Sequence, residues 1–210
     1  MPHFDNEFRE RFRQLLVWRR DVRQFQTQPL PPGLLEELLG LACLAPSVGL
    51  SEPWRFILVK SQEVRSQIRQ EFERANAEAL AGYFGERAAL YHRLKLSGLD
   101  CAPVQLAVFA DRTTAQGAGL GRQTMPETIE YSVVGAVSTL WLAARAHGLG
   151  VGWVSICSPD RVNEILAAPP AWKLVAYLCI GYPAAESDTP ELEREGWQTR
   201  NPARFSLSER

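Results

Sequence analysis

Apolar residues recur at helical spacing in the first 44 residues, on both sides of a proline-rich connection. Residues 5–18 predict an amphipathic helix, because one face is apolar and the other carries arginines. The apolar positions are Phe4, Phe8, Phe12, Leu15 and Leu16. Residues 33–44 are rich in leucine and follow Pro32, which suits the first turn of a helix. We expect this second helix to be buried.

Four later segments have the apolar character of buried strands: residues 55–60, 104–110, 151–156 and 173–182. Helical patterns separate them. Ser61 is a plausible N-cap for a long polar helix to about Phe84, and Ser158 for a short helix to Ala167. An apolar helix begins at Glu127 or Thr128 and reaches His147. Its small residues allow a partner to approach closely, so we expect it at the centre of the fold and at a dimer interface.

Two segments lack a clear pattern. Residues 82–102 mix aromatic, leucine and charged positions, and Gly85 and Gly98 interrupt any long helix, so we interpret this segment as a mobile excursion. From residue 183 the chain predicts a polar tail. The order of elements predicts one domain over residues 1–210, a mixed α/β or α+β fold with a central sheet of four or five strands flanked by helices.

Composition narrows the class of protein. The 210 residues are 46% hydrophobic and 22% charged, with a formal net charge of −1, so no global attraction to nucleic acid or to an acidic membrane is expected. No apolar run is long enough to cross a bilayer, and the charged N-terminus does not resemble a signal peptide, which predicts a cytoplasmic protein. The four cysteines are widely separated and only three histidines are present, so free thiols are expected rather than disulfides or a metal site.

The densest charge pattern is residues 18–25, where Arg19, Arg20 and Arg23 surround Asp21. Three guanidinium groups in five positions form a compact anion pocket suited to a phosphate. The carboxylate must then either orient an arginine or face another part of the ligand. The alternative is a solvated charged turn with internal ion pairs. Neither a G-x-G-x-x-G fingerprint nor a Walker loop is present, so any phosphate is expected to be held by arginines.

Several segments together resemble the nitroreductase-like flavoprotein family, in which FMN lies between the subunits of an intertwined homodimer. The resemblance runs from about residue 15 to 182. It is carried by residues 19–23, 45–47, 53–56, 94–99, 102–103, 121–128, 131–134, 140–146 and 148–155. The chain departs from the family pattern at Glu52, where glutamine is usual, and at Ser138 and Thr139, where glutamine and asparagine are usual.

The resemblance implies a set of flavin-binding residues. The arginines would bind the FMN phosphate and the polar edge of the ring system, with Arg200 as a second phosphate ligand from the tail. Ser47 would contact the flavin from the other subunit, and Leu96 would cover it as part of a lid. The full set is Arg19, Arg20, Asp21, Val22, Arg23, Ser47, Leu96, Ser155 and Arg200. Without the resemblance, Ser47 is also explained as a turn residue, residues 94–99 as an ordinary amphipathic helix, and Ser155 as an outward-facing strand serine.

Asp21 stands where most of the family carries serine, and it resembles the branch of the family that destroys its flavin. The resemblance implies that reduced FMN and O2 yield 5,6-dimethylbenzimidazole, the lower ligand of cobalamin, and erythrose 4-phosphate. Cleavage of the ribityl chain needs a base, for which Asp21 is the candidate, and Ser155 would steer the oxygen reaction. A separate NAD(P)H-dependent flavin reductase would supply reduced FMN. An NAD(P)H-dependent nitro or quinone reductase and a non-catalytic flavin-binding module remain as alternatives.

Overall fold

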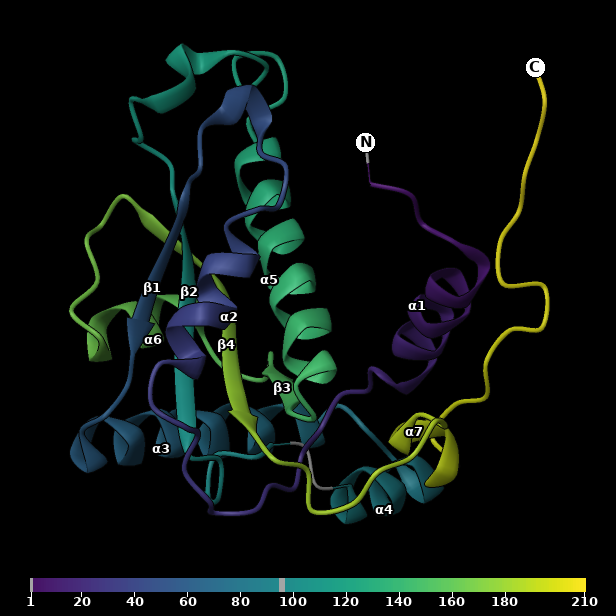
Figure 1. The fold of residues 1–210 in the computed structure, drawn as a ribbon. Helices are drawn as coiled ribbons and strands as arrows, with labels where there is room; N and C mark the ends of the chain where they lie inside the picture. The colour runs from purple at the N-terminus through teal and green to yellow at the C-terminus, as the bar shows by residue number, and fades with distance from the viewer. Residues whose placement is uncertain (1, 95–96) are drawn as a thin grey trace.

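The sheet at the centre of the fold confirms the predicted strands. The computed structural model describes residues 2–94 and 97–210, and within these the sheet has four strands in the order β1-β2-β4-β3, all antiparallel to their neighbours (Figure 1). The strands are β1 Trp54–Leu58, β2 Val104–Asp111, β3 Gly150–Val154 and β4 Trp172–Gly181. Both ends of every strand lie within two residues of the boundaries predicted from the sequence.

Helices cover both faces of this sheet (Figure 1). Alternation along β2 separates the two cores: Leu106 and Val108 pack with α2 (Leu34–Ala42) and α5 (Thr128–Ala146), whereas Ala107 and Phe109 pack with α3 (Gln62–Leu80) and α6 (Pro159–Ile165). The predicted N-caps are confirmed, since the side chains of Ser61 and Ser158 accept hydrogen bonds from the first turns of α3 and α6. Two short 3-10 turns, η1 (Val48–Leu50) and η2 (Gln116–Gly119), contact each other near the start of α5.

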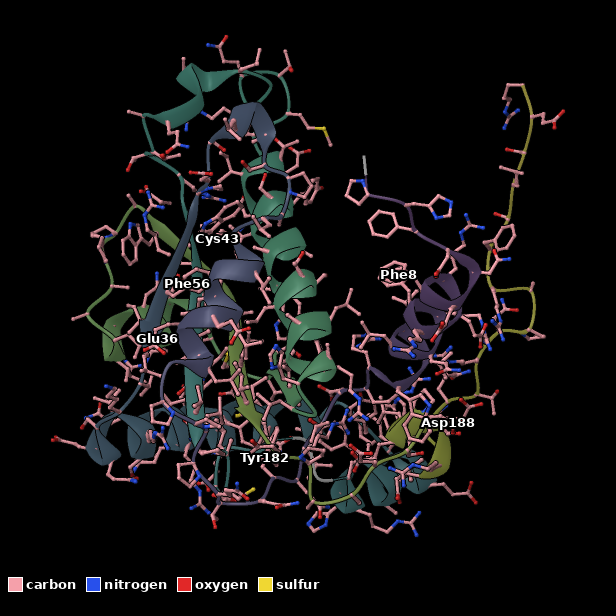
Figure 2. All side chains as sticks on the ribbon, viewed as in Figure 1. Phe8, Glu36, Cys43, Phe56, Tyr182 and Asp188 are labelled. Atoms are coloured by element: carbon pink, nitrogen blue, oxygen red, sulfur yellow. The ribbon has the colours of Figure 1, made fainter. Side chains whose placement is uncertain are left out.

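Helix α1 (Asn6–Trp18) forms as predicted but buries none of its residues. Its apolar side chains stay about half exposed, with Phe8 at 47% and Phe12 at 45%. Figure 1 shows α1 standing apart from the sheet, and in Figure 2 Phe8 lies on the side of α1 turned toward α5. An apolar helix face that stays this exposed is typical of a surface that another molecule covers.

Two segments without a clear pattern in the sequence contain short helices. The excursion over residues 82–102 contains α4 (Gly85–Arg93), whose Tyr91 is buried and donates a hydrogen bond of 2.8 Å to Asn76 on α3. Gly85 has a φ of +57° and begins this helix, so no long helix runs through it, as predicted. The polar tail also contains a short helix, α7 (Glu191–Arg194). Among the described residues, no helix is long and apolar enough to span a membrane.

Candidate active site

The arginine segment directly after α1 is laid along the edge strand β3. Asp21 forms an isolated parallel bridge with Val151, and the Val22 N–H donates to the Val151 carbonyl at 3.0 Å. Glycines in β3 allow this close approach. A Cβ atom on Gly152 would lie 2.1 Å from the Val22 carbonyl oxygen, and one on Gly150 would lie 2.6 Å from a Val22 methyl group. The alternation of glycine in β3 therefore fixes where the candidate site lies.

Asp21 is held on both of its oxygens. Oδ1 accepts a hydrogen bond of 3.0 Å from the Trp153 backbone N–H, and Oδ2 accepts one of 2.8 Å from Arg23 Nε. The side chain of Asp21 is 35% exposed, so one side of the carboxylate still faces the outside. An ionised carboxylate has about four acceptor positions, and these contacts occupy two. Asp21 thus orients an arginine and keeps acceptor capacity for a ligand.

Arg23 is nearly buried, with 11% of its side chain exposed. Its Nη1 has no hydrogen-bond partner among the described residues, and its Nε also lies 4.0 Å from Glu191 Oε2 on α7. Burial raises the pKa of the Glu191 carboxyl. A buried guanidinium nitrogen without an acceptor is costly, so this position fits a ligand that brings an oxygen or a ring nitrogen.

Arg20 is tied to the tail. Its Nε donates to the Asp188 carbonyl oxygen at 2.8 Å, its Nη2 donates to the same oxygen, and its Nη1 donates to the Arg19 carbonyl at 2.9 Å. Figure 2 shows Asp188 on the tail, below α1. Burial and the positive charges of Arg200 and Arg19 lower the pKa of the Arg20 guanidinium. Two further predicted phosphate ligands, Arg19 and Arg200, thus act electrostatically on Arg20.

The same region receives support from the end of α5. The guanidinium of Arg19 lies 4.9 Å above the ring of Trp141, whose Nε1 donates to the Arg20 carbonyl at 3.2 Å. Arg145, one turn later, lies over Trp18 and forms an ion pair with Glu186 at 2.6 Å. A cavity of about 190 Å³ opens between the arginine segment, the end of α5 and the tail.

Ser155 follows directly after the last residue of β3 and is exposed. It lies two residues beyond Trp153, whose N–H binds Asp21. At about 3.3 Å per residue in an extended chain, the two backbone positions are about 7 Å apart. The structure thus brings Ser155 and Asp21 to the same end of β3, and the expectation that Ser155 stands at a strand end is met. Its catalytic role stays a prediction.

Ser47 lies far from the arginines within one chain. Its Oγ accepts a hydrogen bond of 3.1 Å from the Glu52 N–H, while the Val48 N–H donates to Ser132 Oγ near the start of α5. The arginine segment contacts Trp141, nine residues later on the same helix, which corresponds to about 13 Å along its axis. A single chain therefore does not bring Ser47 to the arginine pocket.

The loop that carries Ser47 is tightly constrained. Leu50 and Glu52 have φ values of +56° and +41°, which are unusual for residues other than glycine. A Cβ atom on Gly117 of η2 would lie 2.4 Å from the Gly49 carbonyl oxygen, so the two 3-10 turns are pressed together. Glu52 accepts a hydrogen bond of 2.8 Å from Gln116. The acidic side chain at the usual glutamine position thus has a structural partner within the chain.

Two features separate the site in the structure from the one expected. The tail residues Asp188 and Glu191, which contact Arg20 and Arg23, were not predicted, because an acidic run after a proline has the pattern of a solvated tail. The predicted lid residue Leu96 lies outside the described residues, as does Lys95.

Known proteins resemble this chain over almost its whole length. The profile of the Nitroreductase family matches residues 16–182. A 5,6-dimethylbenzimidazole synthase of Rhodospirillum rubrum is 55% identical over 96% of this chain and 95% of its own length. A protein of the same name from Rhodobacter capsulatus is 46% identical over 97% and 98%. Among solved structures, an oxidized iodotyrosine deiodinase bound to FMN and 3-iodo-L-tyrosine is 27% identical, with a TM-score of 0.70, covering 83% of this chain and 91% of that one.

Proposed function

The chain belongs to the nitroreductase family, and from this premise we propose that it is a 5,6-dimethylbenzimidazole synthase whose substrates are reduced FMN and O2. The products are the benzimidazole, used as the lower ligand of cobalamin, and erythrose 4-phosphate. The observation that carries this proposal is Asp21, a carboxylate fixed by Arg23 and the Trp153 N–H beside the arginine pocket. Identity of 55% to a synthase over nearly the full chain supports it.

The residues of the pocket suit the two ends of FMN. Arg19, Arg20 and Arg200 supply positive charge for the phosphate, and the unpaired Nη1 of buried Arg23 suits an acceptor on the polar edge of the ring system. Val22 holds the segment against β3 through its hydrogen bond to Val151. Bound FMN would supply both the aromatic ring of the product and the ribityl carbon that closes the imidazole.

Asp21 serves as the base in this proposal. When the bond between the first and second ribityl carbons breaks, a proton must leave a ribityl hydroxyl, and a carboxylate can accept it. The two hydrogen bonds to Asp21 fix its orientation and leave acceptor positions free. Ser155, at the same end of β3, would donate a hydrogen bond from its hydroxyl to the reacting edge of the flavin. Leu96 would cover the pocket and exclude water.

The active form in this proposal is a homodimer. Within one chain, Ser47 lies beside the start of α5 and the arginines lie near its end, about 13 Å further along the helix axis, so Ser47 does not line the arginine pocket. A two-fold axis that crosses α5 would bring Ser47 of the partner subunit to the arginine pocket. Exposed apolar side chains are available for such an interface. They are Phe4, Phe8, Phe12 and Leu16 near and on α1, and Tyr131 and Val134 on α5.

Reduced FMN is supplied by a separate NAD(P)H-dependent flavin reductase in this proposal, since the sequence contains no pyridine-nucleotide fingerprint. The proposed location is the cytoplasm, because a reducing compartment suits the four free cysteines, Cys43, Cys101, Cys157 and Cys179.

The test is a single turnover. The protein is loaded with FMN, reduced with light or dithionite without oxygen, exposed to air, and its small molecules are separated and weighed by mass spectrometry. We expect 5,6-dimethylbenzimidazole with loss of flavin. Quantitative return of intact oxidised FMN would contradict the proposal, and added NADPH would then separate a conventional reductase from a binding module.

Substitution of Asp21 tests whether this residue takes part in the reaction. Asp21→Asn should abolish product while FMN still binds, because the amide cannot accept the proton. Asp188→Asn is the matched control, since it removes a negative charge near Arg20 but leaves the backbone carbonyl that Arg20 uses. Equal product from Asp21→Asn and from the unaltered protein would remove Asp21 from the mechanism.

A further inference from the structure

The tail, which begins at residue 183, first contacts the candidate site and then the excursion at residues 82–102. Its first residues pair with the segment after Arg23: the Gln26 N–H donates to the Tyr182 carbonyl at 2.8 Å, and the Ala184 N–H donates to the Gln24 carbonyl at 2.9 Å. The Asp188 carbonyl then binds Arg20. Figure 1 shows the following helix, α7, beside α4. The tail therefore connects two regions that are far apart in the sequence.

Trp197 anchors the tail on the excursion. Its ring lies 5.4 Å from that of Tyr83 at 78°, and 6.1 Å from that of Tyr91 at 60°, which are edge-to-face arrangements. The guanidinium of Arg87 lies 4.8 Å from the Trp197 ring, and its Nη1 donates to the Trp197 carbonyl at 2.6 Å. The Trp197 N–H donates to the Leu192 carbonyl at 2.8 Å. The indole is thus fixed from three sides.

The residue that Trp197 restrains is Arg200, three positions later. Three extended residues span at most about 10 Å, so a fixed Trp197 confines Arg200 to a small region. That region borders the arginine segment, because the Trp197 N–H binds the carbonyl of Leu192, and the preceding residue, Glu191, has its Oε2 4.0 Å from Arg23 Nε. Arg200 itself is exposed, and without an anchor it would lose more conformational entropy on binding an anion.

We propose that Trp197 is a positioning residue for the phosphate of FMN: docked on Tyr83, Tyr91 and Arg87, it holds Arg200 beside Arg20. This inference rests on the proposed function only in taking FMN as the ligand. It also assigns a role to α4, which contributes the aromatic and cationic surface that receives the indole.

The test compares FMN with riboflavin, which lacks the phosphate. Dissociation constants are measured by flavin fluorescence for the unaltered protein, Trp197→Ala, Trp197→Phe and Phe205→Ala. Phe205 is a matched control, because it is an aromatic residue of the same tail that is 81% exposed. We expect Trp197→Ala to weaken FMN binding about tenfold while riboflavin binding is unchanged, Trp197→Phe to retain most of the affinity, and Phe205→Ala to have no effect. Arg87→Ala should give a smaller loss in the same direction.

A double variant decides whether the effect passes through Arg200. If it does, Trp197→Ala should add nothing to the loss caused by Arg200→Ala. Additive losses, an equal loss for FMN and riboflavin, or no loss at all would each overturn the assignment while the proposed function stands. Failure of the unaltered protein to bind FMN would overturn both. Production of 5,6-dimethylbenzimidazole, measured separately, tests the proposed function alone.

Discussion

Replacement of Gly152 by alanine tests how the arginine segment is positioned. The added Cβ would lie 2.1 Å from the Val22 carbonyl oxygen, a distance that no side-chain movement relieves because the neighbour is backbone. Either β3 and the segment stay in contact under strain, or residues 20–23 move away from the strand. The second outcome breaks the bonds from Val22 to Val151 and from Trp153 to Asp21.

The two outcomes lower the free energy of unfolding by similar amounts. Overpacking of a tight contact costs about 1–3 kcal/mol. Loss of one neutral hydrogen bond and one to a carboxylate costs about 2–4 kcal/mol in total. We therefore expect the free energy of unfolding to fall by about 2–3 kcal/mol, and FMN binding to be lost or strongly weakened because Asp21 and Arg23 leave their positions.

Urea denaturation at one fixed protomer concentration measures the stability, and a flavin titration measures the binding. Gly40→Ala is the matched control. Gly40 lies inside α2, and nothing is within 4 Å of the position its Cβ would take, so the same substitution should stabilise the protein by up to about 1 kcal/mol. Unchanged stability and unchanged FMN affinity in Gly152→Ala would refute the positioning argument.

Three further predictions follow from other contacts. Arg20→Gln should weaken FMN binding about tenfold or more with riboflavin binding unchanged, as measured by titration, because only FMN carries the phosphate. Hydrogen bonds from Arg74 and from the Ser158 N–H lower the pKa of the buried Glu71 carboxyl. The ionised carboxylate should therefore stabilise the fold above the ordinary glutamate pKa, and this stabilisation should be lost as the pH falls through the lowered pKa. Acid denaturation of Glu71→Gln, compared with that of the exposed control Glu63→Gln, measures the effect. Phe12→Asp should shift the protein from dimer to monomer in size-exclusion chromatography with light scattering, whereas Arg11→Asp on the polar face should not.

Local sequence patterns were sufficient to predict most helices and strands, but not which of them contact each other. Ser61 and Ser158 mark helix starts because a hydroxyl at an N-cap acts within one turn, and the structure confirms both. Gly85 separates α3 from α4 as expected, but the sequence did not show that a regular helix begins at this glycine. Helix α7 was missed because four residues do not establish a period.

The sequence shows the charged segment of the candidate site but not the residues that contact it or its geometry. Arg19, Arg20 and Arg23 are adjacent in sequence, so their charge is visible there. Their partners are not, since Asp188 and Glu191 come from a tail about 170 residues later. Nor could the sequence show that Ser47 and the arginines lie at opposite ends of α5, because that depends on the way both segments pack on this helix.

The contacts of Asp21 give a physical reason for a carboxylate at a position where the family usually has serine. A serine has a single oxygen that lies one bond closer to the backbone, so it cannot occupy both positions from which Asp21 Oδ1 and Oδ2 reach the Trp153 N–H and Arg23 Nε. The carboxylate therefore couples the edge strand to the buried arginine and places its remaining acceptor positions at the pocket. The hydrogen bonds that orient Asp21, the proposed base, also hold Arg23, the proposed flavin ligand, so Asp21→Ser should disturb Arg23 more than Asp21→Asn does. A larger loss of FMN affinity in Asp21→Ser than in Asp21→Asn would show this coupling, and equal affinities would exclude it.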